Sequence, residues 1–133
     1  MNEIKVLDLP VNGGPDGSLA VIEGCNVVPF NIKRAFYIYG VCGDSVRGNH
    51  ANRNSEMLMV AVSGGVKVTV KDGYTTQTFD LNNPVQGLYL PKMTWKEMRN
   101  FSPDCVLLVL ASEHYDKNEY ITDYGEFEKE VRR

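Results

Sequence analysis

Residues 57–73, MLMVAVSGGVKVTVKDG, hold two apolar runs, each followed by a turn signal. In 66–70 valine alternates with lysine and threonine, which puts the valines on one face of a strand and the polar side chains on the other. Ser-Gly-Gly at 63–65 joins the two runs, and Asp-Gly at 72–73 tolerates the positive φ angles of a tight hairpin. The stretch therefore predicts antiparallel β-structure with one buried face.

Short β-branched and aromatic runs, separated by Gly, Asn, Asp and Pro, continue this pattern over residues 18–111. Besides 57–62 and 66–70, the predicted strands are 19–23, 32–39, 75–80, 87–90 and 106–110. After residue 111 apolar side chains recur every three or four positions, as on one face of a helix: Tyr120, Ile121, Tyr124, Phe127 and Val131. We expect this helix to be capped by Asp116 or Asn118 and to pack over the sheet as a lid.

Length and charge narrow the class of protein. The chain has 133 residues and a formal net charge of −3, so we expect one domain over 1–133. The acidic balance argues against a nucleic-acid or membrane-surface binder, because phosphates attract a positive face. The first residues lack a secretion signal, no apolar run could span a bilayer, and three widely spaced cysteines fit ordinary thiols. A cytoplasmic protein without membrane or nucleic-acid partners is expected.

Two stretches keep the spacing of the cupin motifs. His50, Asn52 and Glu56 fit H-x-H-x3-E with Asn for the second His, and 91–100 fits P-x-G-x2-H-x3-N with Lys96 for the His. The chain thus resembles the cupins, which implies an all-β, jelly-roll-like antiparallel barrel, here with a short C-terminal helix. His50 and Asn52 lie two apart on a strand and should both face the barrel interior, and Lys96 should come from a facing strand.

The same motifs bear on metal binding. A metal-binding cupin uses three His and one Glu, whereas only His50 and Glu56 remain here. Lys96 would put an ammonium, which has no lone pair to donate, where the cation should sit. Neither a metal nor another cofactor is therefore expected. We expect Glu56 to orient neighbouring groups, and an interior with His, Lys and Arg suits an anionic organic ligand.

Arg47-Gly48-Asn49-His50 matches the R-G-x-H signature of the nucleotide-sugar cupins, which include the dTDP-4-keto-6-deoxyglucose 3,5-epimerases. Within that group the chain most resembles the dTDP-sugar 3,4-ketoisomerases, through short matches spread over almost its whole length. The resemblance implies that His50 is the carbon-acid base and that Arg47 contacts the diphosphate.

Three positions depart from the family pattern. Asn52 replaces the second His of R-G-x-H-A-H, Asp16 stands where relatives carry Arg or Tyr, and Lys96 stands where they carry His or Arg. We expect all three in or near the pocket, with Asp16 and Lys96 among the substrate-binding residues.

A 3,4-ketoisomerase removes the sugar C3 proton, passes through an enediol and returns a proton at C4. Histidine has a suitable unperturbed pKa, which makes His50 the expected base. Lys96 or Tyr37 could stabilise the oxyanion, and Asn52 could hydrogen-bond the enediol but cannot carry protons at neutral pH. Among the aromatic residues, one of which could stack on thymine, Trp95 is assigned to substrate binding.

The sequence thus predicts a cofactor-independent ketoisomerase acting on a dTDP-linked 4-keto-6-deoxy sugar. The resemblance places the product in 3-amino-sugar synthesis for a surface polysaccharide. Two alternatives stay open: an epimerase of the same substrate class, and a nucleotide-sugar binding cupin that lost catalysis with Asn52. Family members of this size pair through their sheets, so a homodimer that covers edge strands is expected.

Overall fold

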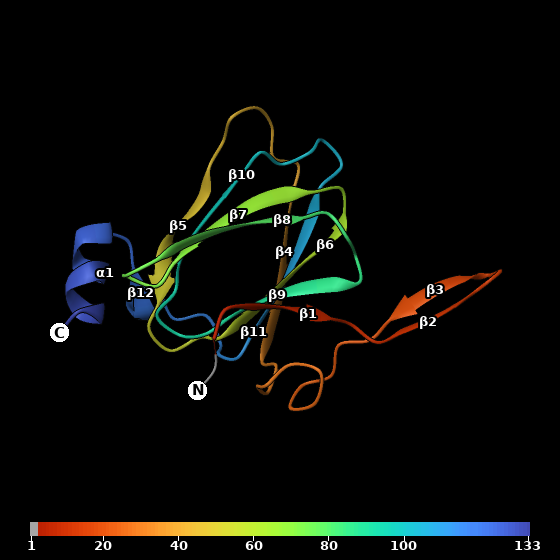
Figure 1. The fold of residues 1–133 in the computed structure, drawn as a ribbon, viewed down its shortest axis with the longest axis horizontal. Coiled ribbons are helices and arrows are strands. Elements are labelled where there is room, and N and C mark those ends of the chain that lie inside the picture. The colour runs from red at the N-terminus through yellow and green to blue at the C-terminus, as the bar shows by residue number, and fades with distance from the viewer. Residues whose placement is uncertain (1–2) are drawn as a thin grey trace.

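The computed structural model describes residues 3–133, which form two antiparallel five-stranded sheets and one outlying hairpin (Figure 1). The first sheet runs β1 (Lys5–Asp8), β9 (Gln86–Leu90), β6 (Met57–Ser63), β11 (Val106–Ala111) and β4 (Arg34–Tyr39). The second runs β12 (Tyr120–Ile121), β5 (Arg47–Asn52), β10 (Trp95–Arg99), β7 (Val66–Lys71) and β8 (Thr76–Leu81). The predicted all-β class is confirmed, with a single short α-helix within the described residues, α1 (Tyr124–Val131).

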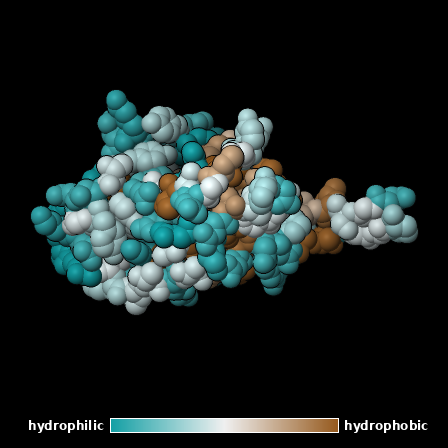
Figure 2. Space-filling view, turned by 90° about the horizontal axis from the view of Figure 1, so that it is seen from above, coloured by the Kyte–Doolittle hydropathy of each residue, from teal (hydrophilic) through white to brown (hydrophobic). Residues whose placement is uncertain are grey.

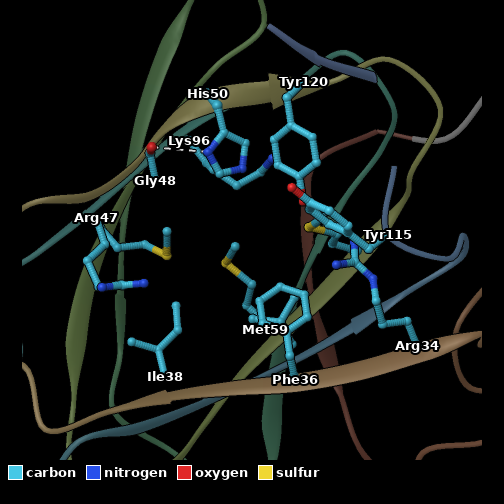
Figure 3. A pocket seen from close by; sticks show the side chains of 13 residues that line it. Arg34, Phe36, Ile38, Arg47, Gly48, His50, Met59, Lys96, Tyr115 and Tyr120 are labelled. Atoms are coloured by element: carbon cyan, nitrogen blue, oxygen red, sulfur yellow. Dashed lines mark hydrogen bonds between the residues drawn. The ribbon is translucent and has the colours of Figure 1, made fainter. Parts of the chain in front are cut away.

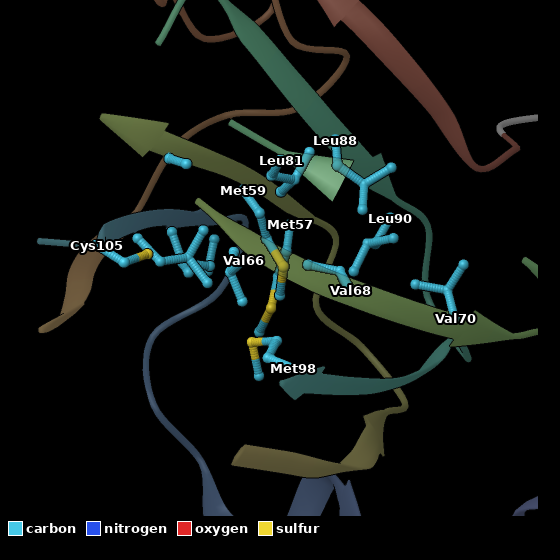
Figure 4. Close-up of a cluster of buried hydrophobic side chains, with 14 residues drawn as sticks. Met57, Met59, Val66, Val68, Val70, Leu81, Leu88, Leu90, Met98 and Cys105 are labelled. Atoms are coloured by element: carbon cyan, nitrogen blue, oxygen red, sulfur yellow. The ribbon is translucent and has the colours of Figure 1, made fainter. Parts of the chain in front are cut away.

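The main core lies between the two sheets (Figure 4). Val66, Val68 and Val70 of β7 are buried, while Lys67 between them is exposed, so the predicted alternation is confirmed. They pack with side chains from the first sheet, among them Met59. A second cluster lies on the other face of the first sheet, where the segment before β4 contributes Val28, Phe30 and partly buried neighbours. Both faces of the first sheet are thereby covered.

The turns at 63–65 and 72–73 have different roles. Asp72 follows β7 and accepts backbone hydrogen bonds from Tyr74 and Thr75, so the predicted hairpin between β7 and β8 is confirmed. The Ser-Gly-Gly turn at 63–65 makes no hairpin, because β6 already pairs with β9 and β11 on its two edges. The chain instead crosses to the second sheet, and the crossing is held by hydrogen bonds between Gly65 and Ser102.

The predicted strand at 19–23 is displaced. The structure forms β3 (Gly17–Ala20) paired with β2 (Val11–Gly14) instead, and every residue of this hairpin is exposed. We call β2 and β3 the arm, because the hairpin projects from the end of the body (Figure 1). Hydrophobic surface gathers where the arm meets the body (Figure 2). The local β pattern was correct, but an isolated hairpin of this kind buries none of its apolar residues within one chain.

The C-terminal helix is shorter than predicted and begins after Asp123, whose side chain accepts from the Glu126 backbone N–H. Asp116 caps the short 3-10 helix η1 (Lys117–Glu119) instead. Tyr120 and Ile121, expected on the helix, form β12 and pair with β5. The helix packs through buried Phe127 at one end of the second sheet. Among residues 3–133 no helix is long and apolar enough to cross a membrane.

Candidate active site

A pocket opens between the two sheets, beside β5 (Figure 3). Its floor and walls are mostly apolar, and its polar groups come from four places in the chain that are distant in sequence. The lining residues are Arg34, Phe36, Ile38, Arg47, Gly48, His50, Met57, Met59, Lys96, Met98, Val109, Tyr115 and Tyr120. Cations, one imidazole and two phenols around an apolar floor suit a ligand that is anionic at one end and has a ring at the other.

His50 is held in one orientation. Its Nδ1 lies 3.0 Å from the carbonyl oxygen of Gly48, and its ring lies 4.8 Å from that of Tyr120. A carbonyl can only accept, so Nδ1 carries the proton, and the neutral ring keeps the lone pair on Nε2. Burial, and then the nearby Lys96 ammonium, lower the pKa of His50 to about 4. The ring is therefore an uncharged potential base at neutral pH.

Gly48 makes this orientation possible. Its φ of 91° lies in the left-handed region, and a Cβ there would approach the Lys96 carbonyl oxygen to 2.8 Å. The pairing of β5 with β10 also shifts register between Lys96 and Glu97, so the strand bends at this point. Such bulges re-aim side chains beside functional sites. The Arg-Gly pair therefore turns Arg47 and His50 toward the same pocket.

Lys96 is buried, and its Nζ donates to Asn52 Oδ1 at 2.8 Å. It lies on β10 opposite His50 in the strand register, so it comes from the neighbouring strand of the same sheet and not from a facing strand. Burial lowers the pKa of the Lys96 ammonium to about 7. An amine with this pKa can give up a proton near neutral pH.

Asn52 lies behind Lys96 and outside the pocket lining, although it shares a strand face with His50. β12 pairs with the far end of β5, where Tyr120 lies opposite Asn52, and of these two residues it is Tyr120 that lines the pocket. Asn52 therefore touches the pocket through Lys96 in this structure, and its contact with the enediol stays a prediction. Its Nδ2 atom is buried and has no hydrogen-bond partner among residues 3–133.

Glu119 is a buried carboxylate that sequence reasoning missed. It accepts hydrogen bonds from the backbone N–H groups of Asn54 and Ser55, both at 2.9 Å, and from the Ser55 hydroxyl. These contacts attach η1 to the end of β5. Glu119 is also the negative charge that opposes the lowering of the Lys96 and His50 pKa values.

Arg34 was also missed. Its guanidinium lies over the rings of Phe36, at 5.0 Å, and Tyr115, at 5.7 Å, and its Nε donates to the Glu113 carbonyl at 3.3 Å. One terminal nitrogen is buried without a partner among the described residues. A guanidinium that is held in place at a pocket wall, with one N–H donor still unpaired, can bind an anionic or oxygen-bearing ligand. Figure 3 shows Arg34 and Arg47 on opposite sides of the pocket.

Four residues assigned to the site lie outside the pocket, and two of them, Tyr37 and Trp95, belong to strands that line it. Tyr37 is 61% exposed, because Phe36 and Ile38 take the inward positions of β4. Trp95 points away from Lys96 and packs on α1, with Nε1 donating to Glu97.

Glu56 accepts from the Tyr89 hydroxyl, in a hollow separate from the pocket. Asp16 is exposed at the tip of the arm. The structure therefore brings together only His50, Arg47 and Lys96 of the predicted set in the pocket, with Asn52 behind them.

The arrangement of potential ligands bears on metal binding. In the described part of the chain, no three His, Cys, Asp or Glu side chains gather where they could hold a metal ion. At the position of a cupin metal ligand stands Lys96, which donates to Asn52. This donor set does not fit a metal.

A family profile described as FdtA, WxcM-like, C-terminal, matches residues 2–132. A curated relative from Aneurinibacillus thermoaerophilus, TDP-4-oxo-6-deoxy-alpha-D-glucose-3,4-oxoisomerase, is 41% identical over 98% of this chain and 94% of its own length.

Two solved structures have nearly the same fold. WlaRA, a TDP-fucose-3,4-ketoisomerase from Campylobacter jejuni, is 44% identical with a TM-score of 0.93, and the match covers 98% of this chain and 96% of that chain. A His-to-Asn variant of the 3,4-ketoisomerase QdtA from Thermoanaerobacterium thermosaccharolyticum, solved with TDP-4-keto-6-deoxyglucose, is 34% identical with a TM-score of 0.95, covering 99% and 96%.

Proposed function

This chain belongs to the WxcM-like FdtA family, and we propose that it is a sugar-nucleotide 3,4-ketoisomerase acting on dTDP-4-keto-6-deoxyglucose. The relatives named above are isomerases of TDP-linked 6-deoxy sugars. The observation that carries the proposal is the neutral His50 imidazole, fixed by Gly48 with Nε2 free, in a pocket that also holds a buried amine.

His50 removes the C3 proton of the bound sugar. The adjacent C4 carbonyl makes that proton acidic, and the cations around the pocket stabilise the negative charge that develops on oxygen. Burial keeps His50 uncharged at neutral pH, so no proton has to leave it before the reaction starts. The phenols of Tyr115 and Tyr120 add hydrogen-bond donors at the same wall.

Arg34 and Arg47 bind the anionic part of the substrate. A guanidinium matches phosphate oxygens with two parallel donors, and both side chains line the pocket from opposite sides. Arg34 is already fixed by Glu113 and the two aromatic rings, so little side-chain entropy is lost when it binds.

The whole chain, 1–133, is proposed to form one cupin domain, since side chains from both sheets share one core. We also propose that it works in the cytoplasm, on a path to a surface polysaccharide, and without a cofactor. All three cysteines are free, and two are exposed, which suits a reducing compartment.

The proposal is tested by incubating the protein with dTDP-4-keto-6-deoxyglucose and locating the carbonyl by carbon-13 NMR. We expect the carbonyl to move from C4 to C3, at the same rate before and after exhaustive chelation. A carbonyl that stays at C4 with inverted stereocentres would indicate an epimerase. Tight dTDP binding without any turnover would indicate a binding module. Activity lost with the chelator and restored by a divalent ion would contradict the cofactor-free mechanism.

A homodimer is proposed on the basis of the exposed arm. Val11 is 45% exposed and Leu19 is 57% exposed, and apolar surface continues at the base of the arm (Figure 2). A second copy would cover this surface and the free edge of β4. Light scattering at micromolar concentration should give about twice the 14.9 kDa mass of the chain. A monomer at that concentration would contradict the proposal.

A further inference from the structure

The reaction needs two proton transfers, and two of the ionisable groups that line the pocket, His50 and Lys96, differ in kind. His50 presents a lone pair, whereas Lys96 presents an ammonium. Both line the same pocket from adjacent strands, as register partners of each other. Asn52 cannot exchange protons at neutral pH and lies behind Lys96, so it cannot supply the second transfer.

We propose that Lys96 is the catalytic acid that delivers the proton to C4, and that Asn52 is the positioning residue that aims its ammonium. The inference rests on the proposed ketoisomerase function and adds the second half of its mechanism. The geometry that carries it is a buried amine on the pocket wall, whose Nζ donates a hydrogen bond to the Asn52 side-chain oxygen.

The protons balance over one turnover. His50 Nε2 takes the C3 proton, and the electron pair of the C3–H bond forms the double bond of the enediolate. The O3 hydroxyl proton passes to O4, and O3 then re-forms a carbonyl as C4 takes a proton from Lys96 Nζ. This leaves an imidazolium and a neutral amine. One proton then moves from His50 to Lys96, which restores the neutral imidazole and the ammonium for the next turnover.

The surroundings of Lys96 fit an acid and not merely a fixed positive charge. The titratable and charged groups that face it are His50 and Arg47 on β5, Glu119 of η1, Tyr120 of β12 and, across the pocket, Arg34 and Tyr115. Its neighbour on β7 is the apolar Val70. With little negative charge close by, burial outweighs Glu119, and the ammonium is poised to release its proton.

The variant Lys96→Arg separates the role of Lys96 as a proton donor from its role as a positive charge. Arginine keeps the positive charge but does not release a proton at neutral pH. In deuterated water, this variant should still exchange the C3 proton for deuterium, while formation of the 3-keto sugar falls by about a hundredfold or more. Lys96→Met is the second variant, chosen for a similar buried volume, and should show the same loss. Lys67→Arg, on the surface, is the matched control.

Asn52→Asp tests the positioning role through a pH profile. In the wild type, kcat/KM should fall as pH rises through about 7, because the acid form of Lys96 is lost there. A carboxylate in place of the Asn52 amide would stabilise the Lys96 ammonium. The alkaline limb of the profile, where kcat/KM falls, would then move up by about 1 to 3 pH units. A limb that stays in place would show that the titrating group is not the ammonium of Lys96 held by residue 52.

The outcomes distinguish failure of the ketoisomerase function from failure of the role of Lys96. Wild-type protein that makes no 3-keto sugar contradicts the proposed function itself. Wild-type turnover together with a Lys96→Arg variant that isomerises within a few fold of it overturns the role of Lys96 alone. Binding of dTDP, measured by calorimetry for each variant, shows that the pocket is folded.

Discussion

Replacing His50 with asparagine is expected to reduce turnover by between about a hundredfold and ten-thousandfold, the usual contribution of a positioned general base. Exchange of the C3 proton with solvent should fall by the same factor, because both processes start with removal of that proton. The affinity for dTDP should stay nearly unchanged, since the imidazole would face the hexose and the nucleotide has no carbon acid. Product formation and proton exchange are read from one NMR time course.

His114 provides the matched control, since it is the only other histidine and is exposed. His114→Asn should have wild-type turnover and exchange. A His50→Asn protein that still exchanges the C3 proton at the wild-type rate would show that another group is the base.

Arg34→Met is expected to weaken dTDP binding by between about tenfold and a hundredfold, because a hydrogen bond to a charged group contributes about 1.5–3 kcal/mol. The buried nitrogen of Arg34 has no partner among residues 3–133, so a bound phosphate or sugar oxygen would supply one. Calorimetry with dTDP measures the change directly. Arg34→Lys should recover only part of the affinity, since it keeps the charge without the planar fork.

Lys67→Met is the control for the loss of one positive charge by itself, because it removes an exposed ion pair outside the pocket. Thermal unfolding of both variants checks that Arg34→Met does not act through stability, because Arg34 also holds the Glu113 carbonyl. If Arg34→Met bound dTDP as tightly as the Lys67→Met control, the assignment of Arg34 to substrate binding would be wrong.

The strands could largely be predicted because their patterns are local. Valine alternation in β7 and the Asp-Gly turn after it decide both the buried face and the hairpin. The turn at 63–65 was correctly placed between two strands, but a sequence does not show that both edges of β6 are already occupied, so that the chain must cross to the other sheet. Pairing partners depend on contacts between distant segments, and short-range patterns do not contain them.

The pocket residues divide in the same way. Arg47 and His50 could be predicted because a short motif holds both the glycine bulge and the side chains. Tyr37 was assigned to the site and Arg34 was missed because both faces of β4 carry aromatic or apolar residues, so alternation does not say which face is inward. Burial of Phe36 and Ile38 decides it.

The assignments near Lys96 failed for a related reason. Trp95 and Lys96 are adjacent on β10 and must face opposite ways, but only the packing of α1 on Trp95 shows which one faces the pocket. Glu119 and Tyr120 lie far from β5 in sequence, and the helical spacing that includes Tyr120 obscured the strand that pairs with β5. Their part in the site follows from tertiary contacts.

The most direct test of the central claim is the position of deuterium in the sugar after wild-type protein and dTDP-4-keto-6-deoxyglucose react in deuterated water. The account predicts a sugar with its carbonyl at C3 and deuterium at C4, because the proton delivered to C4 comes from an ammonium that has exchanged with solvent. A sugar with its carbonyl still at C4 and deuterium at C3 or C5 would contradict it, since the pocket would then remove protons without moving the carbonyl.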